Sequence, residues 1–453
     1  IFSQNLAERE AKDFFGKAKK TPPEFLSLLE IFSLVRHYDL IIAGGGAAGI
    51  MAAGVAASAG RKVLLCERME KPQRKVRISG KGRCNLTNMR SEAEFLKKIR
   101  RSAEFFAPAL RRFSNAETVE FFRRIGVPLS VERGKRVFPA SGKAWDVAEA
   151  HIDWCRRQGA EIACLTRVRE IQTDGGRIAG ATVQTPQGTE RIAAPNVLLA
   201  TGGASYPATG SSGDGYLLAH RLGHTIVEIR PSLTPLVSGL PETDRLKGLA
   251  LRNVAAKLVV DGETTQQEFG ELEFTPFLSG PIVLRMSRRA VDALIEECRV
   301  ELEIDLKPAL DRSKLADRIA REIGSLGPQA EIRQLLRRLL PPQLIPLAAA
   351  TCRLSPSQLL ASLDKRDGER IASVLKSLRI PVSDYRPFSE AIVTAGGVST
   401  EEVDPETMQS RLVGGLYLAG ELLDIDADTG GYNLQIAYST GHLAGELLAS
   451  QSI

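Results

Sequence analysis

Residues 38–49 of this chain read YDLIIAGGGAAG, an apolar run that breaks into glycines and then continues with small, helix-forming residues. Gly44, Gly46 and Gly49 stand in G-x-G-x-x-G register. In such a pattern the first glycine permits a tight turn, the second lets a pyrophosphate approach the backbone, and the third lets helix and strand pack closely. The stretch therefore predicts a strand, a phosphate-binding turn and a helix whose first N–H groups, at Ala47 and Ala48, face an anion.

A second apolar run ends in a carboxylate. Residues 62–67 read KVLLCE, which predicts a strand that ends at Glu67, 18 residues beyond Gly49. A carboxylate in that place suits the two hydroxyls of a ribose. A glycine-rich turn that merely joins a strand to a helix is the alternative reading. The complete βαβ context favours a dinucleotide, NAD or FAD.

The composition is that of a soluble globular protein. The 453 residues are 43% apolar and 25% charged, enough for two or three domains. No apolar run approaches the roughly 20 residues that span a bilayer, and the start of the sequence lacks the pattern of a signal peptide, so we expect a cytoplasmic protein with no membrane partner. The six cysteines form no C-x-x-C, which predicts reduced thiols and no metal site. The net charge of +6 suits an anionic cofactor and does not require nucleic acid.

A basic, glycine-rich loop follows the second strand. Residues 74–88 read RKVRISGKGRCNLTN, in which glycines alternate with hydroxyl, amide and guanidinium groups. A loop so rich in donors suits a phosphate, a ribityl chain or the edge of a flavin ring. A solvated basic loop is the alternative, but it would not need small residues and amides so densely interleaved.

Two later stretches point to FAD rather than to NAD. Residues 167–192 alternate as a β-meander and lead into NVLLATGG at 196–203, a strand whose final turn passes over the cofactor in FAD folds. Residues 415–421 read GLYLAGE, another strand with an acid at its end, and GGYN at 430–433 opens a helix. The positive end of that helix can face the pyrimidine side of a flavin and stabilise the anionic reduced ring.

The middle of the chain interrupts this pattern. Residues 205–386 read as an insertion that is β-like as far as residue 304 and helical from 310 to 378. We assign no chemical role to residues 1–37. They are either a helical extension on the surface or sequence upstream of the first domain.

Several motifs together resemble the BaiN/YhiN-like NAD(P)/FAD-dependent oxidoreductases, a family that includes aminoacetone oxidase. The motifs are AGGGAAG at 43–49, ISGKGRCNLTN at 78–88, VFP at 137–139, ATGG at 200–203, TAGG at 394–397, AGELLD at 419–424 and TGGYNLQ at 429–435. The resemblance implies an α/β fold: a glutathione-reductase-type FAD-binding Rossmann domain with an inserted β-barrel domain and a helical subdomain. The expected division is an N-terminal extension at 1–37, the FAD domain at 38–204 and 387–453, the β-domain at 205–308 and 379–386, and the helical subdomain at 309–378.

The motifs and the resemblance together give the candidate site. For contacts to FAD we expect Gly44, Gly46, Ala47, Ala48, Gly49, Glu67, Arg68, Lys75, Ser79, Gly80, Gly82, Arg83, Cys84, Asn85, Val168, Ala200, Thr201, Gly202, Gly203, Gly420, Glu421, Asp424, Gly430, Gly431, Tyr432, Asn433 and Leu434. As catalytic residues in contact with the substrate we expect Arg83, Asn85 and Tyr432. The alternative for Arg83 is a structural arginine that braces the loop.

The expected function is that of an FAD-dependent oxidoreductase. It moves a hydride between flavin and a small organic substrate with a C=C bond, a C=N bond or an amine, as a reductase linked to NAD(P)H or as an oxidase that uses oxygen. Because there is a single dinucleotide fingerprint, NAD(P)H can reach the flavin only transiently. A tRNA-modifying flavoprotein and a non-catalytic flavin-binding protein are the alternatives, but no recognisable RNA-binding motif is present, so we expect no nucleic-acid partner.

The insertion is expected to select the substrate, since ligand pockets form preferentially between domains. The loop FTPFLSGP at 274–281 is the best candidate for a wall over the flavin, with Phe274 and Phe277 as its apolar side chains. The alternative is that both rings belong to the core of the insertion.

Overall fold

A five-stranded parallel sheet forms the centre of the first part of the molecule. The computed structural model describes residues 36–450, so nearly all of the expected N-terminal extension lies outside the described residues. The strand order is β20-β11-β2-β3-β7. The strands are β2 (Leu40–Ala43), β3 (Val63–Cys66), β7 (Glu161–Ala163), β11 (Val197–Leu199) and β20 (Leu416–Leu418). Every residue of β2 and β3 is buried, as in a parallel sheet covered on both faces.

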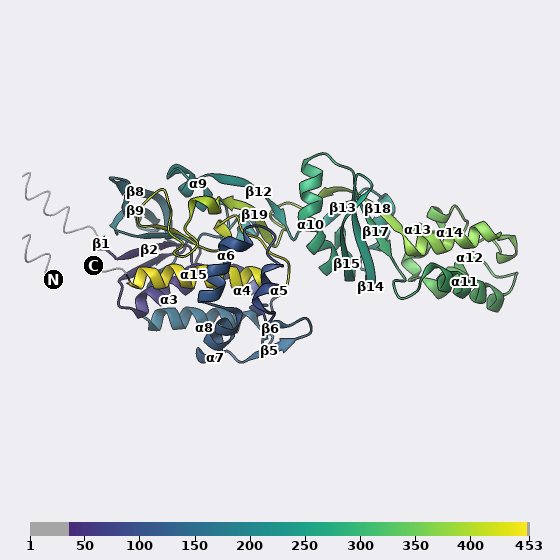
Figure 1. The fold of residues 1–453 in the computed structure, drawn as a ribbon, viewed down its shortest axis with the longest axis horizontal. Coiled ribbons are helices and arrows are strands. Elements are labelled where there is room, and N and C mark those ends of the chain that lie inside the picture. The colour runs from purple at the N-terminus through teal and green to yellow at the C-terminus, as the bar shows by residue number, and fades with distance from the viewer. Residues whose placement is uncertain (1–35, 451–453) are drawn as a thin grey trace, which may run out of the picture.

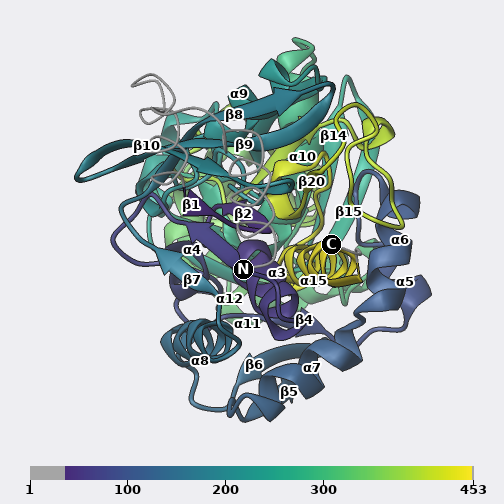
Figure 2. The same ribbon diagram turned by 90° about the vertical axis from the view of Figure 1, so that its left-hand side faces the viewer.

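Helices cover one face of this sheet and a β-meander covers the other (Figures 1 and 2). The helices are α3 (Ala47–Ser58), α8 (Ala144–Arg157) and α15 (Tyr432–Ser450). The expected meander is confirmed: it consists of β8 (Arg167–Asp174), β9 (Arg177–Thr185) and β10 (Gly188–Ala193), joined at its edge by β1 (Arg36–His37). The α/β Rossmann-type fold expected from the sequence is therefore present.

Helix α3 packs against its neighbours almost backbone to backbone. Ten of its 12 residues are buried, so it has no polar face. A Cβ added at Gly49 would lie 1.9 Å from the Gly44 carbonyl oxygen, and one added at Gly441 of α15 would lie 2.4 Å from the Ala48 carbonyl oxygen. Only glycine fits at these positions, so glycines set the distance of α3 from the phosphate turn and from α15.

The segment between β3 and β7 folds beside these helices. It contains α4 (Arg74–Ile78), β4 (Thr87–Asn88), α5 (Glu92–Leu96), α6 (Ala103–Arg112), α7 (Asn115–Arg124), β5 (Leu129–Glu132) and β6 (Arg136–Pro139). Strands β4, β6 and β5 form a small antiparallel sheet. Ser91 with Glu94, and Ser114 with Glu117, form capping boxes that start α5 and α7.

A closed barrel follows and is joined to the Rossmann unit by β12 (Ile226–Ser232), which pairs with β19 (Val393–Val398). The barrel order is β13-β16-β15-β14-β17-β18. Its strands are β13 (Leu236–Ser238), β14 (Ala250–Val260), β15 (Glu263–Phe274), β16 (Leu278–Ser279), β17 (Val300–Asp305) and β18 (Leu378–Tyr385), with α10 (Gly280–Ile295) packed on it. Helix α9 (Asp214–Arg221), although it follows residue 205, packs in the core of the Rossmann unit.

Four helices lie at the far end of the barrel from the Rossmann unit (Figure 1). They are α11 (Arg312–Leu326), α12 (Ile332–Leu339), α13 (Ile345–Cys352) and α14 (Lys365–Lys376). Short 3-10 turns complete the chain: η1 (Pro207–Thr209), η2 (Pro241–Leu246), η3 (Pro342–Leu344), η4 (Leu360–Ser362), η5 (Thr400–Glu402) and η6 (Gly420–Leu422). Within residues 36–450, none of the helices has the length and apolar character that crossing a bilayer requires.

The packing of α3 yields a stability prediction. Gly441→Ala places a methyl group against the Ala48 backbone, and such overpacking costs about 1–3 kcal/mol. Both tryptophans, Trp145 and Trp154, lie on α8 beside α3, so the midpoint of thermal unfolding followed by tryptophan fluorescence should fall. The control is Gly324→Ala on α11, where an added Cβ meets nothing within 4 Å. A Gly441→Ala midpoint equal to that of the control would contradict the packing argument.

Candidate functional site

The glycine turn after β2 forms an open cradle. Gly44 has φ +108°, and a Cβ there would lie 2.5 Å from the Ala200 carbonyl oxygen, so the turn closes directly on the end of β11. A Cβ at Gly46, in contrast, would meet nothing within 4 Å, and no side chain caps α3. The first N–H groups of α3, at Ala47 and Ala48, thus face unfilled space, which fits an anion such as a pyrophosphate.

Glu67 lies beside this cradle. Its Oε2 accepts a hydrogen bond from the Gly45 N–H at 2.8 Å, and its Oε1 accepts one from the Met69 N–H at 2.7 Å. Burial raises the pKa of Glu67, against the effect of these two hydrogen bonds. A carboxylate held in this way at the end of β3 fits a ribose diol, whose hydroxyls donate to oxygens that still have free lone pairs.

Arg68 and Val168, both expected near the cofactor, make structural contacts within the protein. Arg68 pairs with Asp214 at 3.2 Å, and Arg167 pairs with the same carboxylate at 2.6 Å. Val168 is buried in the hydrophobic core around the central sheet of the Rossmann unit. Arg68 is thus engaged in an ion-pair network, and Val168 belongs to a hydrophobic core.

The ends of β11 and β20 meet at Glu421. Lys75 Nζ lies 2.6 Å from Glu421 Oε2, and the Thr394 N–H donates to Glu421 Oε1 at 2.9 Å. A Cβ at Gly203 would lie 2.4 Å from Thr394 Oγ1, so the turn formed by Ala200, Thr201, Gly202 and Gly203 packs tightly on this group. The structure therefore brings together the expected residues of three separate motifs at the carboxyl ends of the parallel strands, where α/β folds bind ligands.

The loop 78–88 docks on the turn that starts α15. In its hydrogen-bonded orientation the Asn85 amide donates to Thr87 O at 3.1 Å and to Val137 O at 3.2 Å, and its oxygen accepts from the Gly431 N–H at 3.1 Å. Asn88 Nδ2 donates to Gly430 O at 3.1 Å. This loop contains the expected residues Ser79, Gly80, Gly82, Arg83, Cys84 and Asn85. The loop 78–88 and the Gly430–Gly431 turn, more than 340 positions apart in the sequence, are thus held together by hydrogen bonds on one side of the candidate site.

Cys84 is a buried thiol in the loop 78–88. Burial raises its pKa to about 12, so the sulfur stays protonated at neutral pH and is a poor nucleophile. All six cysteines lie within the described residues and are free, as the sequence predicted.

Arg83 and Tyr432 differ in their solvent exposure and in their contacts with other side chains. Arg83 forms an ion pair with Glu132, and its guanidinium lies 4.3 Å from the centre of the Phe138 ring, with 47% of the side chain exposed. Tyr432 is 3% exposed and packs edge-on against Phe95, with ring centres 4.8 Å apart. Burial also raises the pKa of Tyr432. Arg83 is therefore held by Glu132 and Phe138 but still exposes part of its side chain to solvent, whereas Tyr432 is almost fully buried.

Asn433 and Leu434 continue the same helix start. Asn433 clamps the preceding loop, because its Oδ1 accepts from the Ala427 N–H at 3.0 Å and its Nδ2 donates to Ala427 O at 2.9 Å. Leu434 packs against a cluster of buried residues that includes Cys84, Leu86 and Phe122. The contacts of Asn433 and Leu434 therefore fix the position of the first turn of α15.

Three buried aspartates lie in this clamped loop, and only Asp424 was expected from the sequence. Asp424 pairs with Arg101 at 2.6 Å, and Asp428 accepts from Arg100 Nε at 2.7 Å. Asp426 accepts from Ser232 Oγ at 3.1 Å and lies 3.3 Å from Nε of Arg288, which comes from α10 on the barrel. Burial raises the pKa of both Asp424 and Asp426. The alternation of acids in DIDAD at 424–428 was the available signal for this group.

Residues 204–215, which follow the expected Gly203 and were almost all assigned to the insertion, pack beside the Glu421 group as well. Ser205 is fully buried and lies 2.7 Å, oxygen to oxygen, from Thr394 Oγ1, and the Tyr206 N–H donates to Phe388 O at 3.0 Å. A Cβ at Gly210 would lie 3.7 Å from Glu67 Oε1, so this segment passes close to the Glu67 carboxylate. The run GGASYPATGSSGDG, as rich in glycine and hydroxyls as the loop 78–88, was the signal in the sequence for this packing.

The two phenylalanines expected over the flavin differ in their surroundings. Phe274 is 2% exposed and belongs to the core of the barrel, which was the alternative reading. Phe277 is half-buried, and the Arg386 guanidinium lies 4.1 Å from its ring centre. Only Phe277 therefore stays available as a wall.

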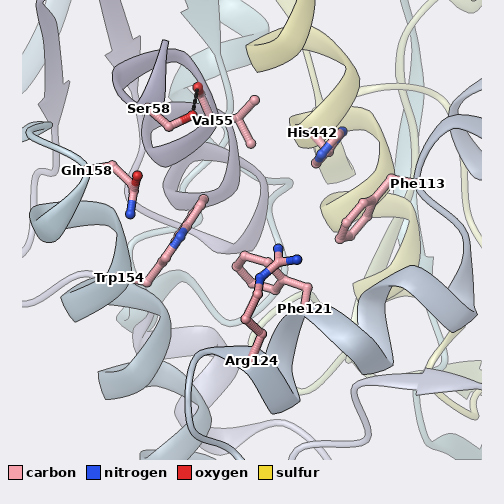
Figure 3. Close-up of a pocket in the computed structure, with 8 residues that line it drawn as sticks. All are labelled: Val55, Ser58, Phe113, Phe121, Arg124, Trp154, Gln158 and His442. Atoms are coloured by element: carbon pink, nitrogen blue, oxygen red, sulfur yellow. Dashed lines mark hydrogen bonds between the residues drawn. The ribbon is translucent and has the colours of Figure 1, made fainter. Parts of the chain in front are cut away.

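A separate cavity of 380 Å³ lies among helices α3, α7, α8 and α15 (Figure 3). It is lined by Val55, Ser58, Phe113, Phe121, Arg124, Trp154, Gln158 and His442. His442 stacks on Phe113 with ring centres 4.3 Å apart. None of the expected site residues lines this cavity, which is distinct from the phosphate cradle.

Comparison with known proteins defines the family. Residues 38–447 match the family model described as HI0933-like protein Rossmann domain. The chain is 32% identical over 415 residues to the 3-dehydro-bile acid delta(4,6)-reductase of Clostridium scindens, covering 90% of this chain and 98% of that protein. It is 29% identical over 420 residues to the ribosomal RNA dihydrouridine synthase of Escherichia coli, covering 92% of this chain and 100% of that protein.

A solved structure shows the same fold. The 3-ketosteroid delta1-dehydrogenase from Sterolibacterium denitrificans superposes with a TM-score of 0.51 at 13% identity, covering 92% of this chain and all of that one. The family expected from the motifs is confirmed: the chain belongs to the HI0933-like family and is a flavin-dependent oxidoreductase with a Rossmann domain.

The position of Glu67 generates a binding prediction. Glu67→Ala should weaken the retention of FAD about tenfold or more, because a hydrogen bond to a charged group contributes about 1.5–3 kcal/mol. The effect should be read from the ratio of flavin to protein during dialysis. The control is Glu70→Ala, an exposed acid three residues further on that pairs with Arg74. Equal retention by the two variants would exclude Glu67 as the ribose ligand.

Proposed function

We propose that this chain is an FAD-dependent reductase of a C=C bond conjugated to a carbonyl group. The observation that carries the proposal is the convergence of the open cradle, Glu67 and the Lys75–Glu421 pair at the carboxyl ends of β2, β3, β11 and β20. The names of the two curated relatives support the choice of substrate, since each describes the reduction of a C=C bond in a ring that also bears a carbonyl group.

The residues of the cradle fit FAD group by group. The N–H groups of Ala47 and Ala48 would hold the pyrophosphate, with Gly44, Gly46 and Gly49 giving the backbone room, and Glu67 would hold the ribose. The loop 78–88 and the Gly430–Gly431 turn would hold the flavin ring, close to the positive end of α15. Bound FAD supplies the hydride chemistry.

We propose that substrate enters between the Rossmann unit and the inserted barrel, with the barrel beginning at β13 and not at residue 205, because α9 packs in the core of the Rossmann unit. The closed barrel between β13 and β18 and the four helices from 312 to 376 support this division. Phe277 and the segment 204–215 offer walls at this entrance. NAD(P)H would deliver its hydride transiently, because the chain has one dinucleotide fingerprint.

In this proposal Arg83 and Asn85 face the substrate. Arg83 carries a permanent charge and an exposed face, which suits a carbonyl oxygen that gains negative charge as the C=C bond is reduced. Glu132 and Phe138 hold the guanidinium in place. Tyr432 would line the same region through its buried ring.

The reaction itself gives the test of the function. The flavoprotein, reduced without oxygen, should transfer its electrons to α,β-unsaturated ketones, seen as the return of the yellow oxidised flavin and as loss of the C=C bond. Isolated alkenes and saturated amines should leave the flavin reduced. If the reduced enzyme reacts with oxygen and with none of the conjugated substrates, the proposal fails.

A conservative variant tests Arg83. Arg83→Lys keeps the charge but loses the planar fork, so turnover per bound flavin should fall about tenfold or more while flavin content stays normal. Arg136→Lys is the matched control, because Arg136 also lies over the Phe138 ring, at 5.7 Å. Unchanged turnover per flavin, with poorer flavin retention, would assign Arg83 to bracing the loop.

A further inference from the structure

The cavity among α3, α7, α8 and α15 has an apolar interior and a polar rim (Figure 3). Phe113 and Phe121 are buried in it, whereas Ser58 and Arg124 are exposed and Gln158 is half-buried. Small-molecule sites in proteins are commonly built in this way. A cavity of about 150 Å³ holds one benzene ring, so the 380 Å³ found here give room for a molecule of two fused rings.

One wall of the cavity is the indole ring of Trp154. Gly54 on α3 lets this ring lie directly against the helix backbone, since a Cβ added at Gly54 would lie 2.2 Å from Trp154 Cζ3. The Phe121 ring meets the indole edge-on, at 87° and with ring centres 4.7 Å apart. The indole is therefore held in place by its neighbours on both α3 and α7.

The other wall is the stacked pair of His442 and Phe113. Their rings are nearly parallel, at 11°. Figure 3 shows this pair on one side of the cavity and Trp154 on the other. Aromatic rings gain energy from one another beyond the area that they bury, so two aromatic walls favour a flat aromatic ligand over an aliphatic one.

Several polar groups of the lining have no partner within residues 36–450. Arg124 forms no ion pair there, and its guanidinium carbon lies 5.8 Å from the centre of the Phe121 ring. His442 Nδ1 is buried without a hydrogen bond, because Glu446 Oε2 is 3.9 Å away. Among the lining residues the one hydrogen bond drawn runs from Ser58 Oγ to Val55 O. A guanidinium and an imidazole thus remain available to a ligand.

The charges around the cavity indicate a ligand with one negative charge. Two acids act on His442, and both are engaged: Glu446 accepts from Arg112 Nε at 2.7 Å, and Glu117 accepts from the Ser114 N–H at 2.6 Å. Burial lowers the pKa of His442, so its ring is neutral at pH 7. Arg124 is then the charged group of the lining. Its planar fork matches the two oxygens of a carboxylate.

We propose that this cavity is a binding site for a flat, two-ring aromatic carboxylate, separate from the flavin site. The rings of the ligand lie between Trp154 and the His442–Phe113 pair, and its carboxylate pairs with Arg124 at the rim. None of the residues expected to contact FAD lines the cavity, so ligand and cofactor can be bound together. The inference does not depend on the proposed function.

The test measures binding to the whole flavoprotein by titration calorimetry with 2-naphthoate. Two matched compounds separate the contributions: naphthalene-2-methanol keeps the rings without the charge, and decahydro-2-naphthoate keeps the charge without the aromatic rings. The variant is Arg124→Gln. Its control is Arg123→Gln, which removes an exposed arginine of the same helix that does not line the cavity.

The wild type should bind 2-naphthoate at least about tenfold more tightly than either matched compound, because only 2-naphthoate suits both the rings and Arg124. Arg124→Gln should weaken the binding of 2-naphthoate about tenfold or more, since a charge-assisted contact is lost, while Arg123→Gln stays within about twofold of the wild type. No binding by the wild type, equal losses in the two variants, or equal affinity for the acid and the alcohol would overturn the proposal.

A second measurement locates the ligand. Saturating 2-naphthoate should leave the absorption spectrum of the bound flavin unchanged and should raise the midpoint of thermal unfolding, because a ligand that binds only the folded state stabilises it. The rise should be smaller for Arg124→Gln at the same concentration. A shifted flavin spectrum would assign the ligand to the flavin site, and either that result or an unmoved midpoint would overturn the proposal.

Discussion

Close contact between backbones around α3 is the constraint on which the rest of the site depends. Gly49 lets the helix start directly above the Gly44 carbonyl, and Gly441 lets α15 lie against the same helix. Because α3 is held there without a capping side chain, its first N–H groups stay open to a ligand. The position of α15, set by the same contact, in turn brings the Gly430–Gly431 turn to the loop 78–88.

Two ion pairs, one of them buried, then link the barrel to the Rossmann unit. Arg288 of α10 reaches Asp426, and Arg230 of β12 reaches Asp292 of α10, so the two units exchange an arginine in each direction. The Arg288–Asp426 pair is buried, and such a pair adds little net stability, but removing one partner leaves a charge uncompensated and costs about 3–5 kcal/mol. The network therefore serves chiefly to define one relative orientation of the two units across the candidate substrate entrance.

The sequence predicted what depends on neighbours along the chain and missed what depends on distant partners. The glycine register of 44–49, the strand ending at Glu67 and the meander could be read locally, because period and turn chemistry determine them. Asp426 could not be placed, since its partners Ser232 and Arg288 lie on other elements. A bracing role for Arg83 and a core position for Phe274 were left as alternatives, because the residues that decide them, Glu132 and the barrel core, lie on other elements. The segment from residue 205 to α9 was assigned to the insertion, although Ser205 hydrogen-bonds to Thr394 and α9 packs in the core of the Rossmann unit.

The pairing of β17 with β18 has an evolutionary consequence. Ile304 and Leu378 are cross-strand partners, although they enclose the whole helical subdomain. The subdomain thus occupies the place of a hairpin turn, and its two ends leave the barrel side by side. Lineages can lengthen, shorten or replace such a segment without shifting the register of any barrel strand or disturbing the flavin site. A common catalytic scaffold can in this way acquire different recognition modules, and reductases of one family can diverge between compact metabolites and macromolecules.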